Sequence, residues 1–88
     1  MKVDVKKSFE KDIEKIKDKK LAIQITKLID ELEAISSLSE IQHLKKMKAK
    51  GNYFRIRVGN YRLGLKLENE TITLLRFMHR KDIYSYFP

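Results

Sequence analysis

The chain of 88 residues carries 20 lysines and arginines against 12 acids, a formal net charge of +8. This length predicts a single domain over residues 1–88 with one core. The chain has no cysteine, which excludes disulfides and thiolate metal sites. Its two histidines lack metal-ligand spacing, so we expect no metal or other cofactor. No apolar run is long enough for a signal peptide or a membrane span, so we expect a cytoplasmic protein.

The excess of positive charge is confined to the second half of the chain. Residues 1–40 contain nine lysines and nine acids, whereas residues 41–88 contain eleven basic residues and three acids. Eight of these basic residues fall between positions 41 and 67, where no acid occurs. A balanced half followed by a half of one sign is typical of proteins that bind a polyanion such as nucleic acid, or an acidic protein partner.

The first forty residues predict a short strand and two helices. Residues 2–6 alternate valine with charged residues, which favours a strand. Ser8 is the expected N-cap of a helix whose apolar stripe begins at Phe9. The stripe is interrupted at residues 18–20 before a second helical pattern begins, which favours two helices joined by a tight turn over one long kinked helix. The second pattern comprises Leu21, Ile25, Leu28, Leu32 and Ile35.

The lysine-rich segment at residues 41–50 has no clear secondary structure. Its apolar residues recur every third position, with lysines between them. One interpretation is a solvated connector pinned to the core by those apolar residues. The other is a segment that also binds RNA phosphate through its four lysines, Lys45, Lys46, Lys48 and Lys50.

The stretch from residue 52 to residue 84 predicts three antiparallel strands. Apolar and basic side chains alternate at residues 53–58 and again at 61–67, and the Gly59-Asn60 pair between them suits a tight hairpin turn. A turn at residues 68–70 and a third strand at 71–77 follow, but this strand is too apolar on both faces to orient Arg76. If both apolar sets of the hairpin share one face, the other face carries Arg55, Arg57, Arg62 and Lys66.

These elements imply an α+β fold of order β-α-α-β-β-β. An antiparallel sheet packs on the two N-terminal helices and leaves its other, arginine-bearing face exposed to water. Residues 82–87 form either a short terminal helix or an extended tail.

The three hairpin arginines suit the recognition of phosphate. Guanidinium groups stay protonated and can hold a phosphate through two parallel hydrogen bonds. Arginines on an exposed strand also serve solubility or edge protection, but three together without a nearby acid favour binding. Aromatic side chains able to stack on unpaired bases, unless they belong to the core, are Tyr53, Tyr61, Tyr84, Tyr86 and Phe87.

His79, Arg80 and Tyr84 near the chain end suggest phosphodiester chemistry. Cleavage of RNA without metal requires a base for the 2′-OH, cations for the transition state and a donor for the leaving oxygen. A histidine can serve at either end of that reaction. Tyr84 can do so if neighbouring cations lower its pKa. The alternative for His79 is an ordinary histidine at a strand end.

Two motifs resemble the RelE/ParE superfamily of toxins from bacterial toxin-antitoxin pairs. They are FRIRVGNYRLGL at residues 54–65 and FMHRKDIY at 77–84, the latter close to the Gly-His-Arg-(basic)-x-x-Tyr pattern of the family. The resemblance covers nearly the whole chain. It implies a ribosome-dependent endoribonuclease that enters the A site and cuts mRNA by 2′-OH attack, leaving a 2′,3′-cyclic phosphate or its hydrolysis product. By position, the working groups implied are Arg55, Arg57, Arg62, Arg80 and Tyr84.

This chain departs from RelE itself in one respect that bears on the mechanism. RelE has lysines on the strand where this chain has Arg55 and Arg57, and arginine is a poor proton acceptor. The general base is therefore either Tyr84 or His79.

The resemblance leaves other functions open and implies a partner. ParE-like relatives share the fold but inhibit DNA gyrase, so a gyrase inhibitor without nuclease activity is the alternative. A third possibility is a plain nucleic-acid-binding module or an inactive relative. Either toxin would be a monomer when free. It would form a hetero-oligomer with an acidic antitoxin that wraps the domain and covers the basic face or displaces the tail. The ribosome and mRNA are the further partners expected, and a membrane is not.

Overall fold

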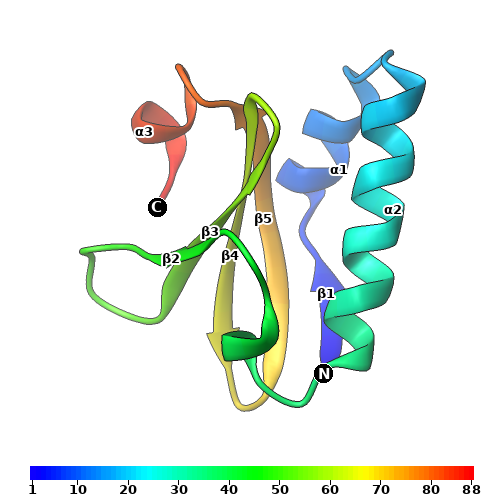
Figure 1. Ribbon diagram of the computed structural model, residues 1–88. Coiled ribbons are helices and arrows are strands. Elements are labelled where there is room, and N and C mark those ends of the chain that lie inside the picture. Colours follow the sequence, from blue (N-terminus) through cyan, green and yellow to red (C-terminus); the bar gives the residue numbers. More distant parts are fainter.

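The alternation of apolar and polar residues produces a five-stranded sheet, which the computed structural model describes together with its helices over residues 1–88 (Figure 1). Helices α1 and α2 lie on one side of this sheet and helix α3 lies on the other. The strands are β1 (Lys2–Val5), β2 (Leu44–Lys46), β3 (Tyr53–Val58), β4 (Tyr61–Glu68) and β5 (Thr71–His79). The helices are α1 (Lys7–Glu14), α2 (Lys19–Ala34) and α3 (Ile83–Tyr86), with a 3₁₀ turn at Leu38–Glu40.

The α+β class and the predicted element order are confirmed, and the sheet has two features that the sequence did not predict. Its strand order is β1-β5-β4-β3-β2. Strand β1 pairs parallel to β5, so the sheet is mixed, although the other pairings are antiparallel. The lysine-rich segment supplies the fifth strand, β2, which pairs with β3 at the sheet edge. Short edge strands rich in lysine protect a sheet against pairing with other chains.

The main core lies between the sheet and helices α1 and α2. Helix α2 begins after Asp18, whose carboxylate accepts hydrogen bonds from the backbone N–H groups of Lys20 and Leu21 at 2.9 and 3.3 Å. The prediction of two helices joined by a turn is therefore confirmed. The buried side chains of this core are Phe9, Leu21, Ile25, Leu32, Leu38, Ile41, Ile56, Val58, Leu63, Leu65, Ile72, Leu74 and Phe77.

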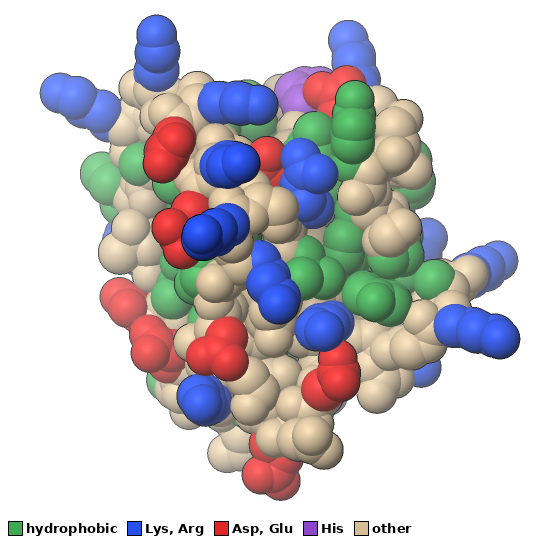
Figure 2. All heavy atoms as spheres, turned by 180° about the vertical axis from the view of Figure 1, so that it is seen from behind, with side chains coloured by type: hydrophobic (Ala, Val, Ile, Leu, Met, Phe, Trp, Pro, Cys, Tyr) green, Lys and Arg blue, Asp and Glu red, His purple; other side chains and the backbone are tan.

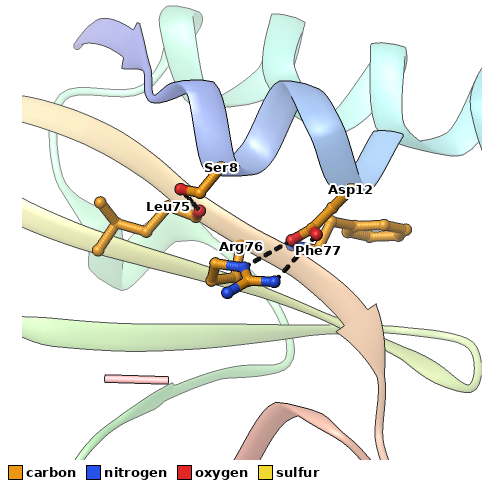
Figure 3. A network of polar contacts seen from close by, with 5 residues as sticks. All are labelled: Ser8, Asp12, Leu75, Arg76 and Phe77. Atoms are coloured by element: carbon orange, nitrogen blue, oxygen red, sulfur yellow. Dashed lines mark hydrogen bonds and ion pairs between the residues drawn. The ribbon is translucent and has the colours of Figure 1, made fainter. Parts of the chain in front are cut away.

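The prediction that Ser8 caps α1 is wrong. Helix α1 begins at Lys7, and its N-cap residue Lys6 makes no side-chain capping bond. The Ser8 hydroxyl instead donates to the carbonyl of Leu75, at 2.6 Å (Figure 3). Leu75 is the extra residue of a β-bulge, because Gly64 pairs with Arg76 while the next residue of β4 pairs with Leu74. The serine therefore joins the helix to the irregular point of β5.

A buried carboxylate also fastens α1 to β5. The side chain of Asp12 is 5% exposed and accepts hydrogen bonds from Nε and Nη2 of Arg76, at 2.8 and 3.1 Å (Figure 3). It also accepts a bond from the backbone N–H of Phe77, at 2.9 Å. The pair raises the pKa of Arg76, chiefly through its hydrogen bonds to Asp12. This carboxylate thus accepts three hydrogen bonds from β5 within the fold.

The C-terminal segment covers part of the second face of the sheet. Residues 82–87 include the short helix α3, as one of the two predicted alternatives had it. Ile83 and Phe87 are 1% and 4% exposed, although neither belongs to the main core. Seen from behind, charges of both signs are mixed over the half that holds α1 and α2, and hydrophobic side chains gather on the other half (Figure 2). No helix has the length and apolar character needed to cross a membrane.

Candidate nucleic-acid interface

The hairpin register brings the three predicted arginines to one surface. Arg57 lies opposite Arg62, and Arg55 lies opposite Gly64. Because side chains two residues apart on a strand share a face, Arg55, Arg57 and Arg62 all point away from the helices. Lys66 shares this face but forms an ion pair with Glu68 at 2.9 Å, so its charge is compensated. The prediction that these four residues share one surface is therefore confirmed. The charge of Lys66, unlike those of the arginines, is neutralised by an acid.

These arginines line an open hollow with a volume of about 280 Å³. No acidic residue borders it. The lining residues are His43, Leu44, Lys45, Arg55, Arg57 and Arg62, and we call this space the arginine hollow. An anion placed in the hollow would meet cations on several sides without a competing carboxylate.

Arg62 shows how closely the positive charges are gathered. Partial burial lowers the pKa of its guanidinium, and the neighbouring charges of Arg55, Arg57 and Arg80 lower it further. Its Nη1 donates to the carbonyls of Gly59 and Tyr61, at 3.0 and 2.9 Å, which fixes the side chain at the hairpin turn. Repulsion of this kind favours the binding of an anion, which would relieve it.

Tyr84 of helix α3 lies beside the hollow, in contact with Arg55. Its hydroxyl accepts a hydrogen bond from Nη1 of Arg55, whose guanidinium carbon lies 4.8 Å from the centroid of the tyrosine ring. This hydrogen bond is the main cause that lowers the pKa of Tyr84 below its ordinary value of 10.0; the charges of Arg55, Lys45 and Arg62 add to the effect. The side chain is 65% exposed, so a large substrate can reach the hydroxyl.

Arg80 and His79 are adjacent in sequence but lie in different surroundings. The backbone N–H of Arg80 donates to the carbonyl of Asn60 at 2.8 Å, which holds Arg80 near the hairpin turn and its charge near Arg62. His79 lies opposite Tyr61, on the helix side of the sheet, with ring centroids 5.6 Å apart. Alternation along β5 places His79 on the same face as the buried Phe77. The structure does not bring His79 into the arginine hollow.

Of the four lysines predicted to bind RNA, one lines the hollow. Lys45 lies opposite Arg55 and contributes to the low pKa of Tyr84. Lys46 lies opposite Phe54 and therefore points toward the other face. Lys48 and Lys50 lie in the exposed loop between β2 and β3.

Sequence reasoning missed His43 as a member of the site. Its Nδ1 lies 2.9 Å from Nη2 of Arg57, and its imidazole lines the hollow. His43 has a φ of 63°, a left-handed conformation that is uncommon for residues other than glycine and that often occurs at functional sites. His43 was missed because strand β2 was not predicted. The pairing of β2 with β3 is what brings His43 beside Arg57.

The site has the donors for an anion and lacks a cluster of metal ligands. No group of three or more His, Cys, Asp or Glu side chains is placed to hold a metal ion. The arrangement supplies fixed cations, an exposed phenol of lowered pKa and one imidazole, which are groups that can bind a phosphodiester and move protons around it.

Known proteins of one family are similar to this chain in sequence and fold. A family model described as "ParE toxin of type II toxin-antitoxin system, parDE" matches residues 3–84. The chain is 42% identical over 89 residues to Toxin RelE3 of Methanocaldococcus jannaschii, and the match covers all of both proteins.

Solved structures agree with this assignment. A chain of the RelB-RelE antitoxin-toxin complex from Methanococcus jannaschii matches with a TM-score of 0.83 and 39% identity, over 97% of this chain and 99% of that one. The archaeal RelE-RelB complex from Pyrococcus horikoshii OT3 shares the fold with a TM-score of 0.74 and 22% identity, over 90% and 93% of the two chains. The protein described here therefore belongs to the RelE/ParE superfamily of toxins from type II toxin-antitoxin systems.

Proposed function

We propose that the protein is a metal-independent endoribonuclease that cuts mRNA in the ribosomal A site. The observation that carries this proposal is the exposed hydroxyl of Tyr84, held by Arg55 at the border of the arginine hollow. A base, a set of cations and open access to a long substrate are thereby combined at one place. The 42% identity to a protein named as a RelE toxin supports the same activity class.

The arginine hollow binds the scissile phosphate in this proposal. Arg57 and Arg62 face each other across β3 and β4, and each guanidinium can donate two hydrogen bonds to phosphate oxygens. Lys45 adds a further positive charge at the rim. The substrate backbone would displace water from cations that already repel one another, so binding would relieve part of that repulsion.

Tyr84 acts as the general base. Its lowered pKa raises the fraction of phenolate at a given pH, and the phenolate removes the proton of the 2′-OH. The 2′ oxygen then attacks the adjacent phosphorus, and the bond from phosphorus to the 5′ oxygen breaks. The products are a 2′,3′-cyclic phosphate and a 5′-hydroxyl end. The position of His79 on the other face of the sheet supports Tyr84 over His79 in this role.

The remaining charged groups stabilise the transition state. Arg57, Arg62 and Arg80 offset the negative charge that develops on the pentavalent phosphorus, and one such donor is typically worth about 10²- to 10³-fold in rate. The leaving 5′ oxygen takes its proton from solvent water, and His43, whose Nδ1 accepts from Nη2 of Arg57 at 2.9 Å, orients that guanidinium in the hollow.

Incubation of the purified protein with programmed ribosomes tests this function, with the ends of the message mapped. We expect cuts within the A-site codon that leave 5′-hydroxyl ends, and a rate about 100-fold lower for Tyr84→Phe. Tyr61→Phe is the matched control, because Tyr61 stacks on Phe77 in the core side of the sheet and should leave the rate unchanged. Intact message at a molar excess of protein over ribosomes would refute the nuclease function.

A gyrase inhibitor is the second candidate, which rests on the description of the matching family as ParE toxin, whereas the relative that matches over its full length is named RelE3. A supercoiling assay separates the two functions. Inhibition of gyrase that persists in Arg62→Ala and Tyr84→Ala would support the inhibitor, since neither residue would then serve catalysis. Uninhibited gyrase together with mRNA cuts would support the nuclease.

We further propose that an acidic antitoxin covers the basic face. Three of the matching structures are toxin-antitoxin complexes of the RelB-RelE type, and this chain carries a net charge of +8. Ionic attraction between exposed groups is screened by salt, so the affinity for such an antitoxin should fall steeply as ionic strength rises. Calorimetric titration at increasing salt would show this, and an affinity independent of salt would contradict an ionic interface.

A further inference from the structure

A row of three residues crosses the central strands on the arginine face. Arg55 of β3 pairs with Gly64 of β4, and Gly64 pairs with Arg76 of β5. The row therefore has a cation at each end and no side chain in the middle.

Each member of this row is covered by an aromatic side chain from the C-terminal segment. The ring of Tyr84 lies on Arg55, with the guanidinium carbon 4.8 Å from its centroid. The ring of Tyr86 lies on Arg76 in the same manner, at 5.4 Å. The third ring, that of Phe87, rests on Gly64 between the two cations. The two outer contacts involve exposed rings, whereas Phe87 is only 4% exposed.

The middle position tolerates nothing larger than hydrogen. A Cβ atom at Gly64 would lie 2.7 to 2.8 Å from three ring atoms of Phe87, a distance that real Cβ atoms do not show. Gly64 is in ordinary β-strand conformation, so its backbone does not itself call for glycine. The absence of a side chain at this position is therefore explained by the ring above it. That ring also packs edge-on against Tyr53, at 5.9 Å between centroids.

Tyr84 depends on this contact for its position. Helix α3 has four residues, too few to be stable without tertiary packing. The two buried anchors of the segment are Ile83 and Phe87, one on each side of Tyr84. An exposed side chain between two anchors is held in place only while both remain seated.

We propose that Gly64 is a positioning residue for Tyr84: it provides the seat for Phe87 that holds the Tyr84 hydroxyl on Arg55. Arg76 serves as the second support of α3, because Asp12 fixes its guanidinium beneath Tyr86 through two hydrogen bonds. The consequence for RNA cleavage rests on the proposed function, whereas the consequence for the position of Tyr84 does not.

The ionisation of Tyr84 provides a test that is independent of catalysis. The chain has four tyrosines, so the phenolate absorbance of each protein is compared with that of its Tyr84→Phe counterpart, which isolates Tyr84. In the parent protein we expect the pKa of Tyr84 to lie below the ordinary tyrosine value of 10.0. In Gly64→Ala we expect the added methyl group to displace Phe87, so that Tyr84 leaves Arg55. The pKa of Tyr84 should then rise toward its ordinary value.

Two further variants control for unrelated effects. Gly59→Asn changes the other glycine of the same hairpin, where a Cβ meets nothing within 4 Å and asparagine tolerates the positive φ, so Tyr84 should titrate as in the parent. Gly64→Ala combined with Phe87→Leu replaces the ring by a smaller side chain and should restore part of the lowered ionisation. Should Gly64→Ala fail to fold by circular dichroism, Phe87→Ala removes the same anchor without adding a methyl group and takes its place in the titration.

Cleavage assays complete the test and separate the two proposals. If both hold, Gly64→Ala lowers kcat about 100-fold through misplacement of the base, with a smaller change in KM. If Gly64→Ala, or Phe87→Ala in its place, leaves the titration of Tyr84 unchanged, the positioning role is refuted whatever the activity. If the titration shifts in Gly64→Ala but the parent protein cuts no RNA, the positioning role stands and the nuclease function fails.

Discussion

The two faces of the sheet are built on opposite principles. The face toward α1 and α2 buries apolar side chains from all the long elements in one continuous core. The opposite face gathers arginines around a hollow and is covered by a four-residue helix with two buried anchors. Hydrophobic burial is the main source of folding free energy, while gathered like charges oppose it. Stability therefore resides mostly on one face and the proposed chemistry on the other.

A substitution in the core should give the largest effect on stability. Leu63 is 0% exposed, and we expect Leu63→Ala to lower the free energy of unfolding by about 3 to 5 kcal/mol. Ile23→Ala is the matched control, because that side chain on α2 is 55% exposed; its cost should stay within about 0.5 kcal/mol. Urea unfolding measures both. Equal costs for the two variants would contradict the assignment of the core.

Removal of the buried carboxylate should cost somewhat less. Asp12→Ala leaves Arg76 without its partner and the N–H of Phe77 without an acceptor, so we expect a loss of about 3 kcal/mol. Glu10→Ala changes an exposed acid on the same helix and should have little effect. Thermal unfolding of the two variants gives the comparison, and similar melting temperatures would mean that the pair does not hold α1 to β5.

On the arginine face the pattern should reverse. Arg62→Ala is expected to lower RNA cleavage about 100-fold, since it removes a donor to the transition state. The free energy of unfolding should change little, because relief of the repulsion from Arg55, Arg57 and Arg80 offsets the loss of the two hydrogen bonds to the hairpin carbonyls. Lys66→Ala, on the same strand and face but paired with Glu68, should leave cleavage near the parent rate. Loss of stability and activity in equal measure for Arg62→Ala would break the separation of the two faces.

The smallest effect concerns the lysines of β2. Lys45→Ala should weaken the binding of single-stranded RNA and reduce the slope of log affinity against log salt by about 1, the loss of one phosphate contact. Lys46→Ala should leave that slope unchanged, since its side chain points to the other face. Fluorescence anisotropy over a range of salt concentrations measures both slopes. The same slope change in both variants would show that only net charge matters.

The sequence was sufficient for features that depend on local periodicity. Alternation along residues 53–58 and 61–67, joined by a two-residue turn, was enough to place Arg55, Arg57 and Arg62 on one face. The four- and three-residue spacings of the apolar side chains in α2 likewise predicted that helix. Both patterns repeat over several residues, so several side chains agree on which face of the element is buried.

Features that depend on a single residue or on distant contacts were not predictable. Strand β5 is apolar on both faces, so Arg76 could not be oriented, and the bulge at Leu75 adds one residue without a sequence signature. Strand β2 has only three residues, too few to show alternation, so His43 was missed. The expected role of Ser8 failed because its hydroxyl bonds to a carbonyl 67 residues away. The need for glycine at position 64 comes from its contact with Phe87, which is 23 residues away in the sequence and could not be predicted.

The dependence of mRNA cleavage on pH, in the parent and in Arg55→Ala, tests the central claim most directly. In the proposed mechanism Tyr84 works as phenolate, so the rate should rise about tenfold per pH unit and level off at the lowered pKa. Arg55 is the main cause of that lowering, so in Arg55→Ala the rise should continue to higher pH before it levels off. A profile that is the same in both proteins, or one that persists in Tyr84→Phe, would contradict the assignment of catalysis to Tyr84 on the arginine face.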